Sequence, residues 1–195
     1  MKKFSVLPVL LAVALVSFSF IKNPARRVPS KSLSRSLAFP VAGRRSTIGG
    51  FWGDNRDGGR RLHKGIDIYA RKGTPVVAIA DGRIVTRDNT PIGGKTLWLK
   101  SSQHPWTAYY AHLDRQLVKE GQYVRKGQVI GTVGNTGNAR SRPPHLHFGI
   151  SPGGGWVNPM PYVKYSPKVT APVLTNRKMA TIARNARTKH RRLHR

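Results

Sequence analysis

Cysteine is absent from the 195-residue sequence. Its absence excludes disulfides, thiolate nucleophiles and thiolate zinc sites together. Acidic residues are scarce as well: seven Asp and Glu stand against 35 Lys and Arg, so the formal net charge is +28. A charge of this size indicates an acidic partner, with nucleic acid as the first candidate, if the charge lies on the folded part of the chain.

The charge lies mostly outside the middle of the chain, since all seven acids fall between Asp54 and Glu120. Residues 1–45 carry nine Lys and Arg and residues 164–195 carry ten, both without an acid. Residues 46–163 have a net charge of only +9. We therefore expect a basic linker over 22–45, a folded domain over 46–163 and a basic, disordered tail over 164–195.

The first 21 residues form a segment of their own. Lys2 and Lys3 precede an unbroken run of 18 apolar and small residues from Phe4 to Ile21. This layout is typical of a secretory signal peptide, with an uncleaved N-terminal anchor as the alternative because the run is at the lower limit of a membrane span. We expect export to the periplasm, cell envelope or extracellular space, with membrane contact only through this segment.

The middle of the chain consists of short apolar runs separated by Gly, Pro and Asn. The Asp81-Gly82 pair between residues 75–80 and 83–86 predicts a β-hairpin with a tight primed turn. Further strands are expected over residues 96–100, 107–111, 128–133 and 145–150, and one helical turn near 114–119. The pattern indicates an all-β, mainly antiparallel domain, a sandwich or a partly closed barrel.

Histidines in this domain occur in patterned surroundings. His145 and His147 flank Leu146 in an expected strand, so both imidazoles emerge from one face of it. His63 and Asp67 are four residues apart and also share a face of an extended segment. These two with one histidine of the pair make three protein ligands, which leaves the fourth position of a zinc ion open, as in catalytic sites.

Tyr110 and His112 form a third cluster, and their spacing predicts that they share one strand face. Taken alone, His112 is more simply a satisfied, half-buried histidine. The four tryptophans are more simply core or groove-wall residues than stacking platforms for bases. Three clusters in one small domain without cysteine nevertheless favour a metal site built from histidine and carboxylate.

These segments together resemble the lysostaphin/LytM-type zinc metalloendopeptidases, in order from about Gly50 to Tyr162. The resemblance is carried by His63-Lys64-Gly65-Ile66-Asp67, Gly73-Thr74-Pro75-Val76, Tyr110-Ala111-His112-Leu113, Gly134-Asn135-Thr136-Gly137 and Pro144-His145-Leu146-His147-Phe148. Residues 49–61 depart from the family's usual Gly-Phe-Gly pattern before the first histidine, so we expect an altered groove rim there.

The resemblance implies a fold, a cofactor and roles for individual residues. The fold is a groove-forming two-layer β-sandwich or barrel-sandwich hybrid with short helices or none. Zn²⁺ is bound by His63, Asp67 and His147, and the catalytic residues beside it are His112 and His145. The implied activity is hydrolysis of peptide cross-links of peptidoglycan, with metal-activated water as the nucleophile.

The expected partners are stem peptides or cross-bridges of peptidoglycan, bound by a monomer, and no specific nucleic acid. Two alternatives remain open. One is a non-catalytic LytM-like activator of other cell-wall hydrolases, although such relatives typically lose metal ligands. The other is a basic polyanion- or nucleic-acid-binding module, in which the histidines have no role.

Overall fold

The computed structural model describes residues 29–153 and 155–170. Its strands are β1 (Thr47–Gly50), β2 (Asn55–Arg56), β3 (Arg61–Leu62), β4 (Ile66–Tyr69), β5 (Pro75–Val77), β6 (Gly82–Thr90), β7 (Gly94–Ser101), β8 (Thr107–Leu113), β9 (Arg115–Gln116), β10 (Tyr123–Val124), β11 (Val129–Thr132) and β12 (His145–Ser151). The α-helices are α1 (Lys31–Ser36) and α2 (Met160–Val163), and short 3₁₀ turns cover Asp57–Gly59 and Gly137–Ala139.

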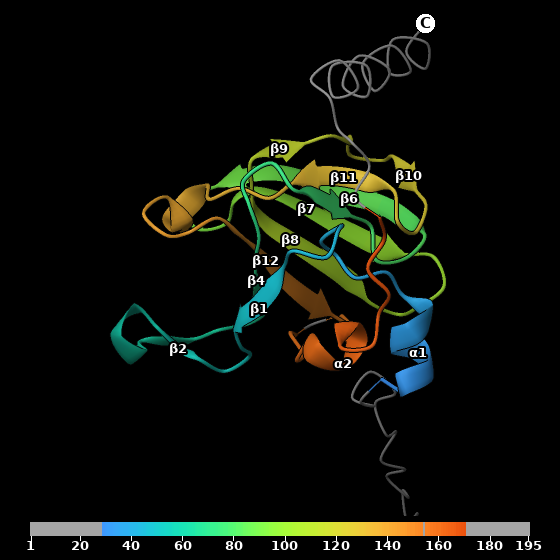
Figure 1. Ribbon diagram of the computed structural model, residues 1–195, viewed down its shortest axis with the longest axis horizontal. Coiled ribbons are helices and arrows are strands. Elements are labelled where there is room, and N and C mark those ends of the chain that lie inside the picture. The colour runs from blue at the N-terminus through green and yellow to red at the C-terminus, as the bar shows by residue number, and fades with distance from the viewer. Residues whose placement is uncertain (1–28, 154, 171–195) are drawn as a thin grey trace, which may run out of the picture.

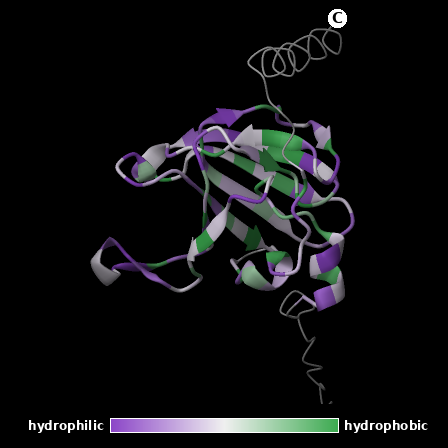
Figure 2. Cartoon of the chain, viewed as in Figure 1, coloured by the Kyte–Doolittle hydropathy of each residue, from purple (hydrophilic) through white to green (hydrophobic). Residues whose placement is uncertain are grey.

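The strands form one large sheet, one small sheet and a projecting hairpin (Figure 1). The large sheet has the order β1-β4-β12-β8-β7-β6-β10, and the small one the order β5-β11-β9. The hairpin of β2 and β3 extends away from both and is mostly hydrophilic (Figure 2). Strand pairs in all three are antiparallel. The expected all-β, mainly antiparallel fold with short helices is therefore confirmed.

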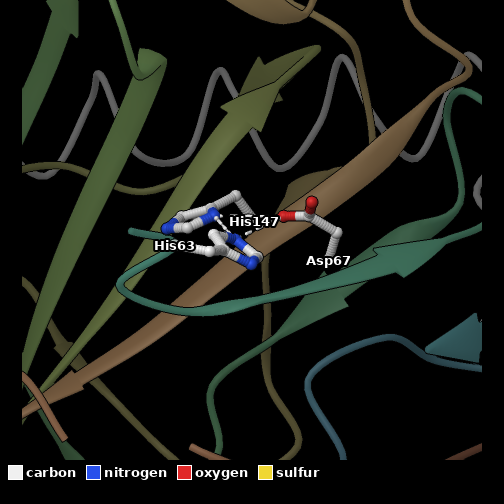
Figure 3. A group of neighbouring side chains, drawn as sticks. All are labelled: His63, Asp67 and His147. Atoms are coloured by element: carbon white, nitrogen blue, oxygen red, sulfur yellow. Dashed lines mark hydrogen bonds and ion pairs between the residues drawn. The ribbon is translucent and has the colours of Figure 1, made fainter. Parts of the chain in front are cut away.

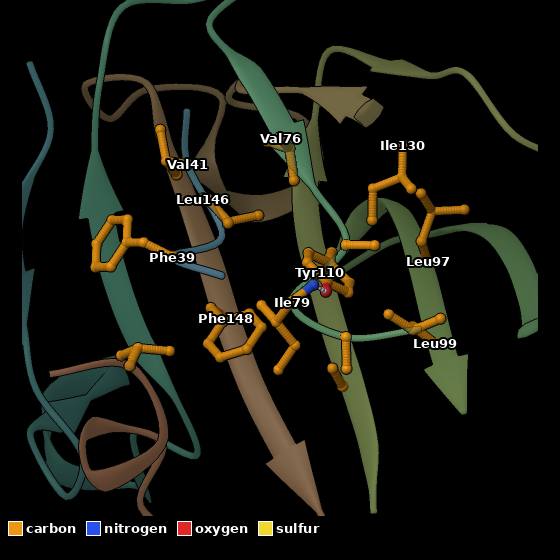
Figure 4. Close-up of a cluster of buried hydrophobic side chains, with 14 of the residues drawn as sticks. Phe39, Val41, Val76, Ile79, Leu97, Leu99, Tyr110, Ile130, Leu146 and Phe148 are labelled. Carbon is orange, nitrogen blue, oxygen red and sulfur yellow. Dashed lines mark hydrogen bonds between the residues drawn. The ribbon is translucent and has the colours of Figure 1, made fainter. Parts of the chain in front are cut away.

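The main core lies between the two sheets (Figure 4). Leu146 and Phe148 of β12 point into it with no exposed surface, as the alternation along that strand predicts. Tyr110 of β8 is also fully buried, and its hydroxyl accepts a 3.1 Å hydrogen bond from the backbone N–H of Ile79. The opposite face of the large sheet is thereby left to carry polar and aromatic side chains.

The packed unit extends beyond the expected range of 46–163 at its N-terminal end. Residues 37–42 are an apolar run that runs along β5, where Val77 N–H donates to the Pro40 carbonyl and Ala42 N–H to the Pro75 carbonyl, both at 2.9 Å. Val41 has no exposed surface and belongs to the main core. This run covers the free edge of β5. In the sequence the run lies within a strongly basic flank, so the expected domain does not include it.

The C-terminal end of the packed unit also lies beyond residue 163. Phe39 N–H donates to the Pro167 carbonyl at 3.0 Å, and Gly43 N–H donates to the Val169 carbonyl at 2.9 Å. Ser34, fully buried on α1, accepts a hydrogen bond from Tyr165 N–H through its hydroxyl. The two ends of the described chain thus hold each other on one side of the fold.

Two local expectations are wrong. The segments around Asp81-Gly82 do not form a hairpin, since β5 belongs to the small sheet and β6 to the large one. Gly82 is required instead by a close approach, because a Cβ there would collide with the carbonyl oxygen of Lys100 on β7. The helical turn expected near 114–119 is replaced by the short strand β9.

Other expectations fall on residues outside the described part. These are the signal or anchor over 1–21, residues 22–28 of the basic linker, and the tail beyond residue 170. Within the described residues, the helices are too short to span a bilayer.

Candidate functional site

Two neighbouring strands of the large sheet bring the predicted metal ligands together (Figure 3). Asp67 on β4 pairs directly with His147 on β12, so both side chains leave the same face of the sheet. His63 precedes β4, and its Nε2 lies 2.9 Å from Nδ1 of His147. Oδ1 of Asp67 is 3.1 Å from each of these two nitrogens. The three donor atoms form a nearly equilateral triangle.

This triangle fits a zinc ion. Two ligand atoms at 2.0–2.1 Å from a tetrahedral zinc stand about 3.3 Å apart, close to the separations found here. Two imidazole nitrogens and one carboxylate oxygen are a donor set that zinc accepts, and three protein ligands leave its fourth position free. His63, Asp67 and His147 are the residues that would hold the metal.

The second nitrogen of His63 is fixed by the backbone. Its Nδ1 lies 2.7 Å from the carbonyl oxygen of Phe51 and 2.7 Å from Nη2 of Arg56. The carbonyl calls for a proton on Nδ1 and the guanidinium for a lone pair there, so the two contacts hold the ring in place while Nε2 faces the other two ligands. The altered segment before the first histidine thus supplies the partner that orients this ring.

Arg56 of β2 is a further residue of the site, which the sequence patterns did not single out. Its Nη2 donates to Oδ2 of Asp67 at 2.7 Å, the carboxylate oxygen that does not face the histidines. Burial alone would raise the pKa of Asp67, but the hydrogen bonds from His147 and His63 hold that pKa well below its usual range. The carboxylate is therefore ionised and held at both oxygens.

Two glycines give the ligands their room. A Cβ at Gly65 would lie 2.5 Å from Cε1 of His147, so the ring packs directly on the backbone of the segment between His63 and Asp67. A Cβ at Gly50 would lie 2.5 Å from Oδ2 of Asp67. The glycine in the middle of the His-Lys-Gly-Ile-Asp motif is explained by this close approach.

The two predicted catalytic histidines lie beside the ligands. The ring of His112 is 5.0 Å from that of His145 and 5.9 Å from that of His147 between centroids. Nδ1 of His112 lies 2.9 Å from the Thr136 carbonyl, and Nδ1 of His145 lies 2.8 Å from the Pro143 carbonyl. Each Nδ1 therefore carries a proton and is held by the backbone, which leaves Nε2 for the site.

The prediction that Tyr110 and His112 share a strand face is wrong. Tyr110 lies in the core, whereas His112 adopts a φ of 61° and turns its ring to the opposite side, toward His145. This left-handed backbone is uncommon outside glycine and breaks the alternation of the strand. Burial, with the neighbouring His145 and His147, lowers the pKa of His112 to about 4, so its ring is neutral near pH 7.

All five residues predicted from the sequence thus lie in one cluster on the outer face of the large sheet. Residues 61–159 match peptidase family M23. The chain belongs to this family. The resemblance seen in the sequence motifs is therefore confirmed.

Several M23 relatives can be compared with the chain. The murein hydrolase activator NlpD of Salmonella dublin is 38% identical over 130 residues, which cover 67% of this chain and 34% of that protein. The L-Ala–D-Glu endopeptidase of Bacillus subtilis (strain 168) is 37% identical over 125 residues, which cover 58% of this chain and 38% of that protein. The chain therefore matches only about a third of the length of these two curated relatives.

Solved structures of M23 relatives have the same fold. The catalytic domain of lysostaphin from Staphylococcus simulans is 35% identical, with a TM-score of 0.54, over 60% of this chain and 92% of that chain. A zinc-containing peptidase from Vibrio cholerae is 29% identical, with a TM-score of 0.58, over 65% of this chain and 40% of that chain.

Proposed function

We propose that this protein is a zinc-dependent endopeptidase that hydrolyses peptide bonds of peptidoglycan. The observation that carries the proposal is the triangle of His63, Asp67 and His147 beside two histidines that are both anchored through Nδ1. A structural zinc site has four protein ligands, whereas three ligands with titratable neighbours are typical of a catalytic one.

The roles follow from what amide hydrolysis requires. When bound, zinc supplies a Lewis acid and lowers the pKa of a water ligand toward about 7. The reaction also needs a group that takes a proton from the attacking water, one that returns a proton to the leaving nitrogen, and stabilisation of the developing oxyanion. His112 and His145 share these tasks through Nε2, because their Nδ1 atoms are occupied by backbone carbonyls.

Five alanine variants test the proposal. We expect His63→Ala, Asp67→Ala and His147→Ala to lose stoichiometric zinc and hydrolysis together. His112→Ala and His145→Ala should keep zinc and lose hydrolysis. Zinc is measured by elemental analysis of the purified protein, and hydrolysis by mass analysis of fragments released from purified peptidoglycan, with and without a chelator.

His104→Ala is the matched control, because this histidine stacks on Trp106 with ring centroids 5.4 Å apart and is not part of the cluster. It should keep both zinc and hydrolysis. Stoichiometric zinc in all three ligand variants would refute the metal assignment.

Two observations keep a second role in view. NlpD, one of the relatives, carries the name of a murein hydrolase activator, and the chain spans only part of its length. A protein that binds zinc, releases no fragments by itself and raises the rate of a separate wall hydrolase would support the activator role. Tight DNA binding by the chain at moderate salt would instead support a polyanion-binding module.

The location and the assembly state belong to the same proposal. Substrate of this kind lies outside the cytoplasm, which agrees with the export expected from residues 1–21. We propose a monomer, which light scattering of the purified chain tests.

A further inference from the structure

A groove runs from the candidate metal site across the outer face of the large sheet. Its first part is a cavity of about 550 Å³ that begins at His63. Its second part is a cavity of about 530 Å³ on the other side of Trp98. Trp98 and Ser151 line both cavities, so the two lie next to each other.

The register of the sheet places the groove floor in rows across the strands. The row next to His147 contains Gly149 on β12, Tyr109 on β8 and Trp98 on β7. The following row contains Ser151, Thr107 and Lys100. Two residues of a strand span about 6.6 Å, so these rows lie about 7 Å and 13 Å beyond the row of His147.

Aromatic rings are clustered in this groove beside the metal site. Trp98 lies 4.6 Å from Tyr109 and 5.3 Å from Trp156 between ring centroids, and Tyr109 in turn contacts His147 at 6.0 Å. Each of these residues is half-buried, so part of its surface stays accessible. Trp52, from the altered segment before the first histidine, lines the first cavity as well.

The indole of Trp156 packs directly on Gly149. A Cβ at this position would lie 2.5 Å from Cζ3 of the indole, so the ring rests on the bare backbone of β12. The indole is therefore held against the sheet by the same strand face that carries His145 and His147. Such support gives a rigid apolar platform instead of a mobile surface tryptophan.

The charge of the groove has one sign. Lys64 lines the first cavity and Lys100 the second, and among the described residues that line either cavity none is acidic. The occupant therefore combines flat apolar faces for the indoles with a negative charge or hydrogen-bond acceptors for the lysines.

We propose that this groove, built on Trp98 and Trp156, binds the sugar rings of the glycan strand to which the cleaved stem peptide is attached. The inference rests on the proposed function. Peptides of peptidoglycan offer mainly small or charged side chains, whereas the C–H faces of its pyranose rings match the open faces of indoles. The carboxylates of the stem peptide suit Lys64 and Lys100.

The spacing of the rows also limits which bond is cut. An extended peptide covers about 3.3–3.6 Å per residue, so a sugar at 7–13 Å from the metal row is separated from it by roughly two to four residues. The scissile bond should therefore lie within the stem peptide, near its attachment to the sugar.

The first test is binding without catalysis. Isothermal titration calorimetry of the metal-free 195-residue protein uses peptide-free oligosaccharides of alternating N-acetylglucosamine and N-acetylmuramic acid. We expect saturable binding that Trp98→Ala and Trp156→Ala each weaken by roughly tenfold or more, as for a buried aromatic anchor. Tyr165→Ala, at an exposed aromatic residue that lines neither cavity, is the matched control and should bind as the parent does.

The second test is substrate preference. The ratio of kcat/KM for a stem peptide with its disaccharide to that for the same peptide without it should be about tenfold or more in the parent protein and fall toward one in both tryptophan variants. Because Trp98 lies within a strand and Trp156 outside one, a folding defect in one variant leaves the other as a test.

Several results would overturn the inference. They are the absence of oligosaccharide binding, equal binding by a sugar-free stem peptide, and a substrate ratio that neither tryptophan variant changes. Failure of the proposed function is distinguishable: oligosaccharide binding that needs both tryptophans, in a protein that hydrolyses neither substrate, would support the groove and refute the endopeptidase.

Discussion

Replacing Gly65 by alanine tests the geometry of the metal site most directly. The added Cβ would lie 2.5 Å from Cε1 and 2.7 Å from Nε2 of His147, and 2.7 Å from the carbonyl oxygen of Phe148. Ordinary contacts of a Cβ begin near 3.4 Å, so the imidazole and the strand beneath it must move apart by the order of 1 Å. A zinc–ligand distance tolerates only about 0.2 Å.

The size of the effect follows from the strain. Overpacking by one methyl group costs about 1–3 kcal/mol when the surroundings are close-packed, which corresponds to about 5- to 150-fold in an equilibrium constant. We therefore expect Gly65→Ala to weaken zinc binding by at least about fivefold. If His147 no longer binds the metal, the loss should approach about 150-fold. The metal-free protein should also lose stability, because one of the three contacts is to the backbone.

The assay is a competitive zinc titration against a fluorescent chelator, with urea unfolding of the metal-free protein alongside. Gly155→Ala is the control: a Cβ there meets no atom within 4 Å, and the change should leave the zinc affinity unaltered. A zinc affinity of Gly65→Ala within threefold of the parent value would show that the site accommodates the methyl group, and the close-packing explanation of the motif would fail.

Four other changes have expected outcomes. Tyr110→Phe leaves a buried backbone N–H without its acceptor, so urea unfolding should show a loss of about 1–3 kcal/mol at unchanged zinc affinity. Arg56→Met removes the ion-pair partner of the buried Asp67, so the melting temperature of the metal-free protein should fall. Adding zinc should raise the melting temperature of this variant by more than it raises that of the parent protein. The pKa of His112 is lowered from 6.5 to about 4, so the stability of the folded protein that depends on neutral His112 is complete above pH 6.5 and is lost as the pH falls toward 4. Between pH 4 and 6.5 the urea midpoint of metal-free His112→Gln should therefore depend less on pH than that of the parent. Truncation to 46–163 removes the buried run along β5 and should abolish cooperative thermal unfolding, whereas residues 29–170 should retain it.

Much of the site was predictable because strand geometry is simple. Alternation along residues 145–150 predicts that His145 and His147 leave one face while Leu146 and Phe148 enter the core, and the structure has this arrangement. The spacing of His63 and Asp67 likewise fixes a shared face once the segment is extended. Local periodicity is sufficient wherever the backbone stays regular.

Periodicity failed where the backbone departs from regular geometry. Nothing in Tyr110-Ala111-His112 signals the φ of 61° at His112 that turns its ring out of the core side. The Asp81-Gly82 pair has the composition of a tight turn, but the glycine is needed for the approach of a neighbouring strand. A turn-forming pair and a close-packing glycine look the same in one sequence, because both require only the absence of a Cβ.

Arg56 and residues 37–42 were missed for a different reason, which is the excess of positive charge. One arginine among 35 basic residues carries no signal of its own, and only the contact with Asp67 distinguishes it. The apolar run 37–42 was detectable, since six consecutive residues without charge interrupt a basic segment. The net charge of the whole flank obscures that run. Its burial depends on contact with β5, which is distant in the sequence.

One face of β12 carries both residues of the candidate metal site and residues of the proposed sugar-binding groove. Because side chains alternate with a period of two, His145, His147, Gly149 and Ser151 must all face the groove, in that order along the strand. The distance from the candidate ligand His147 to Gly149, on which Trp156 packs, is therefore fixed by the strand itself. Trp156, by contrast, follows the end of β12, and Trp52 belongs to the segment before the first histidine. Changes in the segment after β12 can thus alter which substrate is held without moving the ligands. Changes around Trp52 act on the ligands as well, because the same segment supplies the Phe51 carbonyl to His63 and Arg56 to Asp67.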